Sequence, residues 1–269
     1  MTLKQLRTRL DPFTGRIVYN LWQRRQYPLN TPVYTPGGVP WADTFGGDHN
    51  VSFLEFTLQQ MERVQDLLGK HMYAEEQPLY PQQLQGPAVQ RKPGALRAIP
   101  YATIDVREDL LAYYQTVLSA MCERHDEPET YGMTAYTDAT LLLWVSERLN
   151  HGKHVAYAKA AEDSENRFRL KEVSHDPVAL FQRLQDKPRE GLVLRHALAY
   201  ASALNAADGF VSASSAIDPE LGFIWTDKPR RLEEQTVVEF FKWLIRTTTE
   251  VQVKYLQAEN VQRALGWRG

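Results

Sequence analysis

The sequence of 269 residues has a single cysteine, Cys122, which excludes disulfides within the chain and argues against a zinc site built from cysteines. No run of about 18 apolar residues occurs, so no membrane-spanning helix is expected. The formal net charge of -2 gives no reason to expect nucleic acid or a membrane surface as a partner. The opening residues MTLKQLRTRLDPF lack the apolar segment of a signal peptide, and we expect a cytoplasmic protein.

The motifs of several well-known enzyme classes are also missing. The chain has no G-x-G-x-x-G, no P-loop, no H-E-x-x-H and no G-x-S-x-G. Composition leaves a Ser-His-Asp triad open, but no local signature indicates one. Among the seven histidines, His151 and His154 are three residues apart without an acidic ligand pattern nearby. We therefore expect both to be structural or solvated, and we expect no metal site.

Alternation of polar and apolar residues over a convincing length is missing too, whereas helical periodicity recurs along the chain. We predict an all-α fold, a single domain over residues 1–269, built as a helical bundle with long connecting loops. The predicted helices cover residues 3–26, 52–72, 106–125, 137–161, 176–185, 188–207 and 232–265. Proline- or glycine-rich loops are predicted at 28–50, 73–104 and 209–229. The central helix, 137–161, is expected to pack between the first, the 188–207 and the last helices.

Two details of these helices depend on single residues. Asp11-Pro12 is a good pair to begin a helix, so residues 3–26 form either one helix or two, with Arg7 on the first. Asp138 is expected to cap the central helix, and Asp105 is expected to cap the helix before it.

The central helix carries two cations, Arg148 and Lys159. They are eleven residues apart, which is about three turns plus roughly 20°, so both project from one face about 16 Å apart. Either both are half-exposed and paired with surface acids, or they face an anionic partner within the fold. Two pairs spaced i,i+4 later in the chain are candidate partners: Asp186 with Glu190, and Thr248 with Gln252.

Five segments of the chain carry a family likeness: RIVYNLWQRRQYPLNTPVY, SFLEF, EEQPLYP, SERLNHGKHVAYAK and TTTEVQVKYL. Together they resemble the eukaryotic-type chorismate mutases, the all-helical branch of the AroQ class. The resemblance runs from about Leu6 to Leu256 with the segments in the order of the family. RLNHGKHVAYAK is the most specific segment, since the family typically shows R-I-H-x-G-K-x-V-A-E-A-K there.

The resemblance implies an activity and a partner. Members of this family are homodimers that convert chorismate to prephenate, a unimolecular Claisen rearrangement at the branch point to phenylalanine and tyrosine. In the transition state the ether oxygen gains partial negative charge, so a catalyst must hold the chair-like conformer and stabilise that charge. Cations and hydrogen-bond donors suffice for this, and we expect no metal or cofactor.

By resemblance, four side chains would bind the carboxylates and the ether oxygen of chorismate. Arg148 and Arg7 would grip the two carboxylates through their planar guanidinium groups. Lys159 would point at the ether oxygen and stabilise its developing charge. Gln252 would donate to the same oxygen from the opposite side.

Three more residues would complete the site. Glu190 and Asp186, one turn apart, would accept the substrate hydroxyl, and Thr248 would assist a carboxylate. Eukaryotic members usually carry Glu where Gln252 stands and Asn where Asp186 stands. The smaller bacterial helical mutases carry Gln and Asp at these positions, so we expect the pocket to work.

Three alternatives stay open at this point. If Pro12 breaks the first helix, Arg9 or Arg16 would take the place of Arg7. The activity could be that of an isochorismate-pyruvate lyase, which shares the helical fold and a similar pocket in shorter chains. The chain could also be a non-catalytic binding or partner-activating protein, which a loss of pocket residues would favour.

Well-known fungal members of the family are inhibited by tyrosine and activated by tryptophan at a site in the dimer interface. The matching positions here are Gly69, Lys70, Gly132, Met133 and, in a looser alignment, Leu232. In those members two consecutive arginines and a Gly-Ser help form the effector site. The side chains at the matching positions here cannot make the same contacts. We therefore predict that this chain lacks that regulation.

Overall fold

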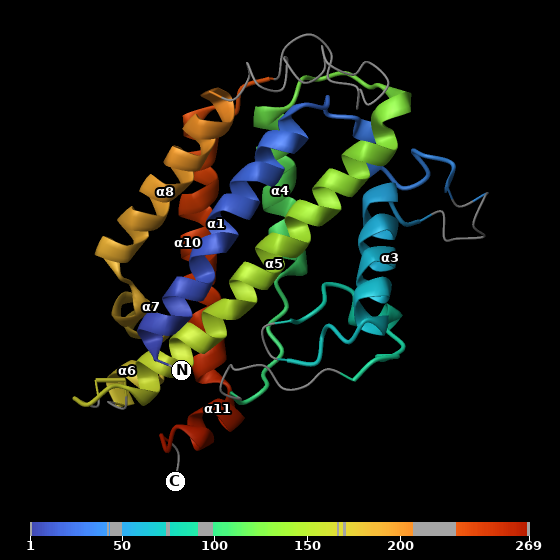
Figure 1. Ribbon diagram of the computed structural model, residues 1–269. Helices are drawn as coiled ribbons and strands as arrows, with labels where there is room; N and C mark the ends of the chain where they lie inside the picture. The colour runs from blue at the N-terminus through green and yellow to red at the C-terminus, as the bar shows by residue number, and fades with distance from the viewer. Residues whose placement is uncertain are drawn as a thin grey trace.

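A computed structural model of the chain describes residues 2–41, 43, 50–73, 76–90, 99–165, 167–168, 171–206 and 230–267. Within these ranges every regular element is a helix and no strand occurs (Figure 1), which confirms the all-α prediction. The loop predicted at 209–229 lies outside the described residues. None of the described helices is long and apolar enough to cross a membrane.

Four long helices form the body of the bundle: α1 (Leu3–Arg25), α5 (Tyr131–Ala161), α8 (Lys187–Ala206) and α10 (Glu234–Gln257). α1 and α10 each pack against both α5 and α8. In Figure 1, α8 and α5 accordingly lie on opposite sides of α1 and α10. The structure thus corrects the prediction that the central helix packs on the 188–207 helix, because α1 and α10 lie between them.

Shorter helices cover this body: α3 (Phe53–Leu67), α4 (Arg107–Met121), α6 (Lys171–Ser174), α7 (Pro177–Leu184) and α11 (Glu259–Ala264). Three 3-10 turns, η1 (Thr31–Tyr34), η2 (Pro81–Gln83) and η3 (Pro128–Thr130), lie in the connections. The predicted helix 52–72 ends early, because the chain turns at Gly69, whose φ of 82° suits glycine. The predicted helix 232–265 breaks at Ala258, and this break places Val261 of α11 in the core with no exposed surface.

α1 remains one helix despite Pro12, which lies inside it. Proline has no N–H to donate to the preceding turn. Two features compensate for this loss. At the start of the helix, Thr2 and Gln5 form a capping box with bonds of 3.3 and 2.9 Å. The inner face buries side chains such as Leu10 and Ile17, and each buried aliphatic side chain stabilises the fold by about 1.5–3 kcal/mol.

Two hydrophobic clusters form the core of the described part. The larger fills the space between the four long helices, α3 and α4, and the smaller joins the ends of α5 and α10 to α7 and α11. Both clusters include residues of α5 and of α10. These two helices therefore run through both parts of the core.

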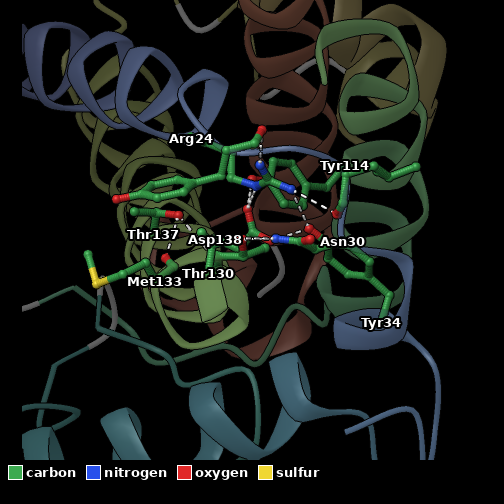
Figure 2. Close-up of polar contacts among 11 residues, drawn as sticks. Arg24, Asn30, Tyr34, Tyr114, Thr130, Met133, Thr137 and Asp138 are labelled. Atoms are coloured by element: carbon green, nitrogen blue, oxygen red, sulfur yellow. Dashed lines mark hydrogen bonds and ion pairs between the residues drawn. The ribbon is translucent and has the colours of Figure 1, made fainter. Parts of the chain in front are cut away.

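A buried polar network lies where the end of α1 meets the start of α5 (Figure 2). The Nε atom of Arg24 is 2.6 Å from Oδ1 of Asp138, and neither side chain has exposed surface. The hydroxyls of Tyr114 and Tyr34 donate to the same carboxylate at 2.6 and 2.5 Å. The Arg24 guanidinium also donates to the Tyr27 carbonyl at 3.0 Å. The network thereby ties α1, η1, α4 and α5 together.

This network shows that the predicted cap at Asp138 is wrong. α5 begins at Tyr131, a full two turns earlier, and Asp138 serves as the partner of a buried arginine. The amide of Asn30 holds the first turn of α5 instead, donating to Thr130 Oγ1 and Thr134 Oγ1 at 2.8 Å each. Asp105 was predicted to cap α4, and it lies one residue before the actual cap, Val106. Its carboxylate accepts from the Arg107 N–H at 2.9 Å.

Candidate active site

A cavity within the bundle gathers the side chains that the sequence singled out. It lies between the first half of α1, the second half of α5, the start of α8 and the second half of α10, and we name it the bundle cavity. Six of the seven predicted site residues line it: Arg7, Arg148, Asp186, Glu190, Thr248 and Gln252. The seventh lies next to it.

Arg7 reaches the bundle cavity from α1. Because the helix continues through Pro12, Arg7 keeps its place, and its guanidinium forms an ion pair with Asp186 at the start of α8. The alternatives Arg9 and Arg16 are exposed and are not part of the cavity lining. The possible break at Pro12 is therefore ruled out, and neither Arg9 nor Arg16 takes the place of Arg7 in the cavity lining.

Arg148 is the cation of the bundle cavity that forms no ion pair in the described structure. It is partly buried, and it forms no hydrogen bond or ion pair with another described residue. Burial lowers the pKa of its guanidinium to about 10, with repulsion from Arg189 acting in the same direction and Asp11 opposing it. The group stays protonated at neutral pH, so the cavity contains a positive charge that a ligand carboxylate would stabilise.

Lys159 lies beside the bundle cavity. Its ammonium donates to the backbone carbonyl of Leu184, a lining residue. Burial lowers its pKa and Arg7 lowers it further, whereas Asp186 and Glu190 act in the opposite direction. An ammonium group has three donors, so Lys159 can keep the carbonyl contact and still donate to a ligand.

The start of α8 presents two carboxylates, Asp186 and Glu190. Asp186 Oδ1 accepts from the Arg189 N–H at 3.2 Å, and Glu190 Oε1 accepts from the Asp186 N–H at 3.0 Å. Glu190 Oε2 also accepts from Lys187 Nζ at 3.1 Å. These bonds fix both carboxylates at the first turn of α8, where backbone N–H groups are free to bind them. The pair therefore offers acceptors to a hydroxyl in the cavity.

α10 contributes Thr248 and Gln252 from its buried face. The Thr248 hydroxyl donates to the Leu244 carbonyl at 2.7 Å, which leaves its oxygen free to accept. The Gln252 amide makes no hydrogen bond to any other described residue, although only 6% of the residue is exposed. It is available to donate into the cavity.

Three residues of the site escaped the sequence analysis: Asp11, Arg189 and Gly152. Asp11 and Arg189 line the cavity and form an ion pair. A Cβ at Gly152 would lie 2.8 Å from Thr248 Cγ2, so this glycine lets α5 and α10 approach closely at the site. Helical spacing carried the signal for the first two, since Asp11 is four residues after Arg7 and Arg189 is three after Asp186.

The positions that match the fungal effector site lie away from the bundle cavity. Lys70 forms an ion pair of 2.8 Å with Glu147 of α5. Nothing lies within 4 Å of a Cβ built at Gly132, Met133 is 38% exposed, and Leu232 is buried. Because Lys70 is already paired within its own chain, these contacts support the prediction that the regulation is missing.

Comparison with known proteins confirms the resemblance predicted from the sequence. The chain is 25% identical over 265 residues to a chorismate mutase of Emericella nidulans, covering 95% of this chain and 91% of that protein. It is 24% identical over 264 residues to the cytosolic chorismate mutase 2 of Zea mays, covering 95% of each. The crystal structure of the Aro7p chorismate mutase of Candida albicans in complex with L-Trp superposes with a TM-score of 0.71, at 21% identity over 96% of this chain and 90% of that one. No protein-family model matches the chain.

Proposed function

We infer that this chain is a chorismate mutase, an isomerase that converts chorismate to prephenate on the way to phenylalanine and tyrosine. The observation that carries the inference is Arg148, a cation at the bundle cavity that forms no ion pair or hydrogen bond with another described residue. Such a group is stabilised when an anion binds. The resemblance to chorismate mutases, which extends over nearly the whole chain, identifies the anion as a dicarboxylate.

The site residues keep the roles that the resemblance assigns, as part of this proposal. Arg148 and Arg7 bind the two carboxylates of chorismate, with Thr248 assisting. This positioning holds the substrate in its chair-like conformer and removes the entropy cost from the reaction step. Because Arg7 is paired with Asp186, the substrate carboxylate has to share or replace that contact.

Lys159 and Gln252 stabilise the transition state in this proposal. The breaking C–O bond leaves negative charge on the ether oxygen, and an ammonium and an amide N–H are both donors suited to it. Glu190 and Asp186 accept the substrate hydroxyl. The reaction requires no nucleophile, because bonds form and break within one molecule.

An assay on the purified protein alone tests the function. Loss of chorismate absorbance together with the appearance of prephenate is the expected result. An isochorismate-pyruvate lyase would instead release pyruvate from isochorismate, and a binding or partner-activating protein would do neither. The last two outcomes would each overturn the proposal.

The proposal includes a homodimer. Apolar side chains are exposed on α3 and in the turn after it, with Val64 at 57%, Leu67 at 45% and Leu68 at 65% exposure. On α5, Tyr136 is 54% exposed. Exposed apolar surface on adjacent helices supports a protein interface. Light scattering after size-exclusion chromatography should give twice the chain mass, and Leu68→Glu should lower it to that of a monomer.

The proposal also covers location and domain organisation. The maize relative named as cytosolic supports a cytoplasmic enzyme, and cell fractionation tests this. A single domain over residues 1–269 is supported by the two core clusters, because α5 and α10 contribute to both. Unfolding in one cooperative transition, seen equally by circular dichroism and fluorescence, is the corresponding test.

A further inference from the structure

Arg189 is an additional arginine at the bundle cavity, beside Arg7 and Arg148, and the family resemblance gives it no role. It comes from the first turn of α8, directly before Glu190. Its side chain is 24% exposed, so it faces the cavity more than the solvent. A guanidinium in this place is chemically suited to a carboxylate, since its planar fork matches two oxygens.

The contacts of Arg189 place it between a negative and a positive neighbour. Its Nη2 forms an ion pair with Asp11 Oδ1 and lies 3.4 Å from the backbone carbonyl of Arg7. On the other side it is near enough to Arg148 to repel that guanidinium. Asp11 therefore neutralises a cation that would otherwise add to the positive charge around Arg148.

The two ion pairs of the cavity follow one pattern. Arg7 is held by Asp186, and Arg189 is held by Asp11, while Arg148 forms no ion pair in the described structure and is repelled by Arg189 more than it is attracted by Asp11. The cavity measures about 80 Å³, whereas pockets for drug-sized ligands usually measure about 300–1,000 Å³. Side chains that line it must therefore move to admit a dicarboxylate, and the paired arginines and acids are among these side chains.

We propose that Arg189 is a further substrate-binding residue, and that Asp11 is an internal competitor that holds the Arg189 guanidinium until a substrate carboxylate replaces it. The proposal rests on the chorismate mutase function inferred above. Exchange of one carboxylate for another keeps the cation paired throughout, so the exchange avoids an unpaired charge. The substrate must, however, displace Asp11, and Asp11 therefore weakens substrate binding.

If the ion pair between α1 and α8 is purely structural, the expected changes in KM are different. In that case loss of either partner would weaken the link between the helices, and both variants would change KM in the same direction or not at all. Internal competition instead predicts opposite signs, because loss of Arg189 removes a binding group whereas loss of Asp11 frees one. The sign of the Asp11 effect separates the two explanations.

The experiment measures chorismate turnover and the inhibition constant of a bicyclic dicarboxylate transition-state analogue. Wild type is compared with Arg189→Gln, Arg189→Lys, Asp11→Asn and the double variant Asp11→Asn/Arg189→Gln. The control is the exposed pair Arg246 and Glu250 of α10, 2.9 Å apart, changed to Arg246→Gln and Glu250→Gln. Circular dichroism and thermal unfolding check that each variant is folded.

We expect Arg189→Gln to raise KM and the inhibition constant about tenfold with kcat within about threefold, since one charge-assisted contact is lost. Arg189→Lys should recover part of the loss. Asp11→Asn should lower both constants at least threefold, and most of this gain should vanish in the double variant, because Asp11 forms its ion pair with Arg189 and attracts Arg148 only as a lesser effect. The control variants should leave both constants unchanged.

The opposite outcomes overturn the inference without touching the proposed function. If wild type converts chorismate but Asp11→Asn leaves both constants unchanged or raises them, Asp11 is not a competitor. If Arg189→Gln binds the analogue as wild type does, Arg189 is not a binding residue. Should Arg189→Gln fail to fold, the sign of the Asp11→Asn effect still decides. A wild type that neither converts chorismate nor binds the analogue would instead refute the proposed function itself.

Discussion

Arg24 and Arg148 are arginines of the same bundle with opposite surroundings. Arg24 has no exposed surface and lies 2.6 Å from the carboxylate of Asp138, whereas Arg148 is partly buried and faces Arg189. Burial pulls the pKa of both groups down. At Arg24 burial is the largest single influence, but Asp138 together with smaller contributions from Tyr34, Cys122 and Tyr114 outweighs it, and the pKa lies above its usual value. At Arg148 repulsion from Arg189 adds to burial, and the pKa falls to about 10.

The difference separates a charge that serves the fold from a charge that serves a ligand. Around Arg24 the tyrosines 34 and 114 and loop carbonyls complete the polar contacts within the chain (Figure 2). Around Arg148 the described part of the chain supplies no ion pair or hydrogen bond, and the attraction of Asp11 is smaller than the repulsion of Arg189. A fully paired buried arginine is stabilised when the protein folds, and an unpaired one is stabilised only when an anion binds.

The largest effect is expected at the buried pair of Arg24 and Asp138. Asp138→Ala leaves the Arg24 guanidinium buried without its acid, and removal of one partner from a buried pair costs about 3–5 kcal/mol. Urea unfolding should show a free energy of unfolding lower by this amount. The exposed Glu239→Ala, whose partner Lys242 is on the surface, should change it by less than about 0.5 kcal/mol. An equal, small effect of both substitutions would show that the Arg24–Asp138 pair is no more important to the fold than an exposed pair.

Beside the bundle cavity, Lys159→Ala should lower catalytic activity and leave stability unchanged. A preorganised charge at developing negative charge contributes about 3 kcal/mol to the transition state, which corresponds to a loss of at least about 100-fold in kcat/KM. Steady-state assays of chorismate turnover and thermal unfolding of the same preparation measure both quantities. The exposed Lys254→Ala of α10 is the control. A folded Lys159→Ala enzyme with a third of wild-type kcat/KM would contradict the role of Lys159 in the transition state.

Gly152 affects the site through packing, whereas Arg148 and Lys159 affect it through charge. A methyl group there would lie 2.8 Å from Thr248 Cγ2, and overpacking of this kind costs about 1–3 kcal/mol. Gly152→Ala should therefore shift α10 and lower kcat/KM about tenfold. Gly132→Ala adds a methyl group to the same helix with nothing within 4 Å, and it should keep full activity. Equal kinetics of the two variants would show that α10 does not need this close approach.

The smallest expected effect is a change in the pH profile. Gln252 donates at every physiological pH, so wild-type kcat/KM should be flat around neutrality. It should fall in alkaline solution below the ordinary lysine pKa, because the lowered pKa of Lys159 makes the ammonium lose its proton earlier. Glu at position 252 must be protonated to donate, so Gln252→Glu should move the activity toward acid. An unchanged profile in that variant would contradict the role of Gln252.

Helical spacing alone predicted most of the bundle and the face that carries Arg148 and Lys159. Spacing could not show that Asp138 is buried, because its partner Arg24 is more than 100 residues away in the chain. The break of the last helix at Ala258 was also missed, since the packing of Val261 decides it and no proline or glycine marks it.

The family resemblance, rather than spacing, assigned Arg7 to the site, whereas the i,i+4 spacing had already marked Thr248 and Gln252 as candidates, and the cavity brings the three residues together. Asp11 and Arg189 match no feature of the resemblance. Helical spacing places them on the same faces as Arg7 and Asp186, but their pairing depends on the approach of α1 to α8, which tertiary packing decides. The sequence therefore predicts residues that a family pattern names, and misses those that this chain adds.

The most direct test of the central claim is Arg148→Met, with urea unfolding and chorismate turnover measured on one preparation. An unpaired charge contributes nothing to folding, so the free energy of unfolding should stay within about 1 kcal/mol of wild type or rise. The same substitution should lower kcat/KM at least about 100-fold, because a carboxylate-binding guanidinium is lost. A variant that loses several kcal/mol of stability and keeps its activity would show that Arg148 belongs to the fold and not to the ligand.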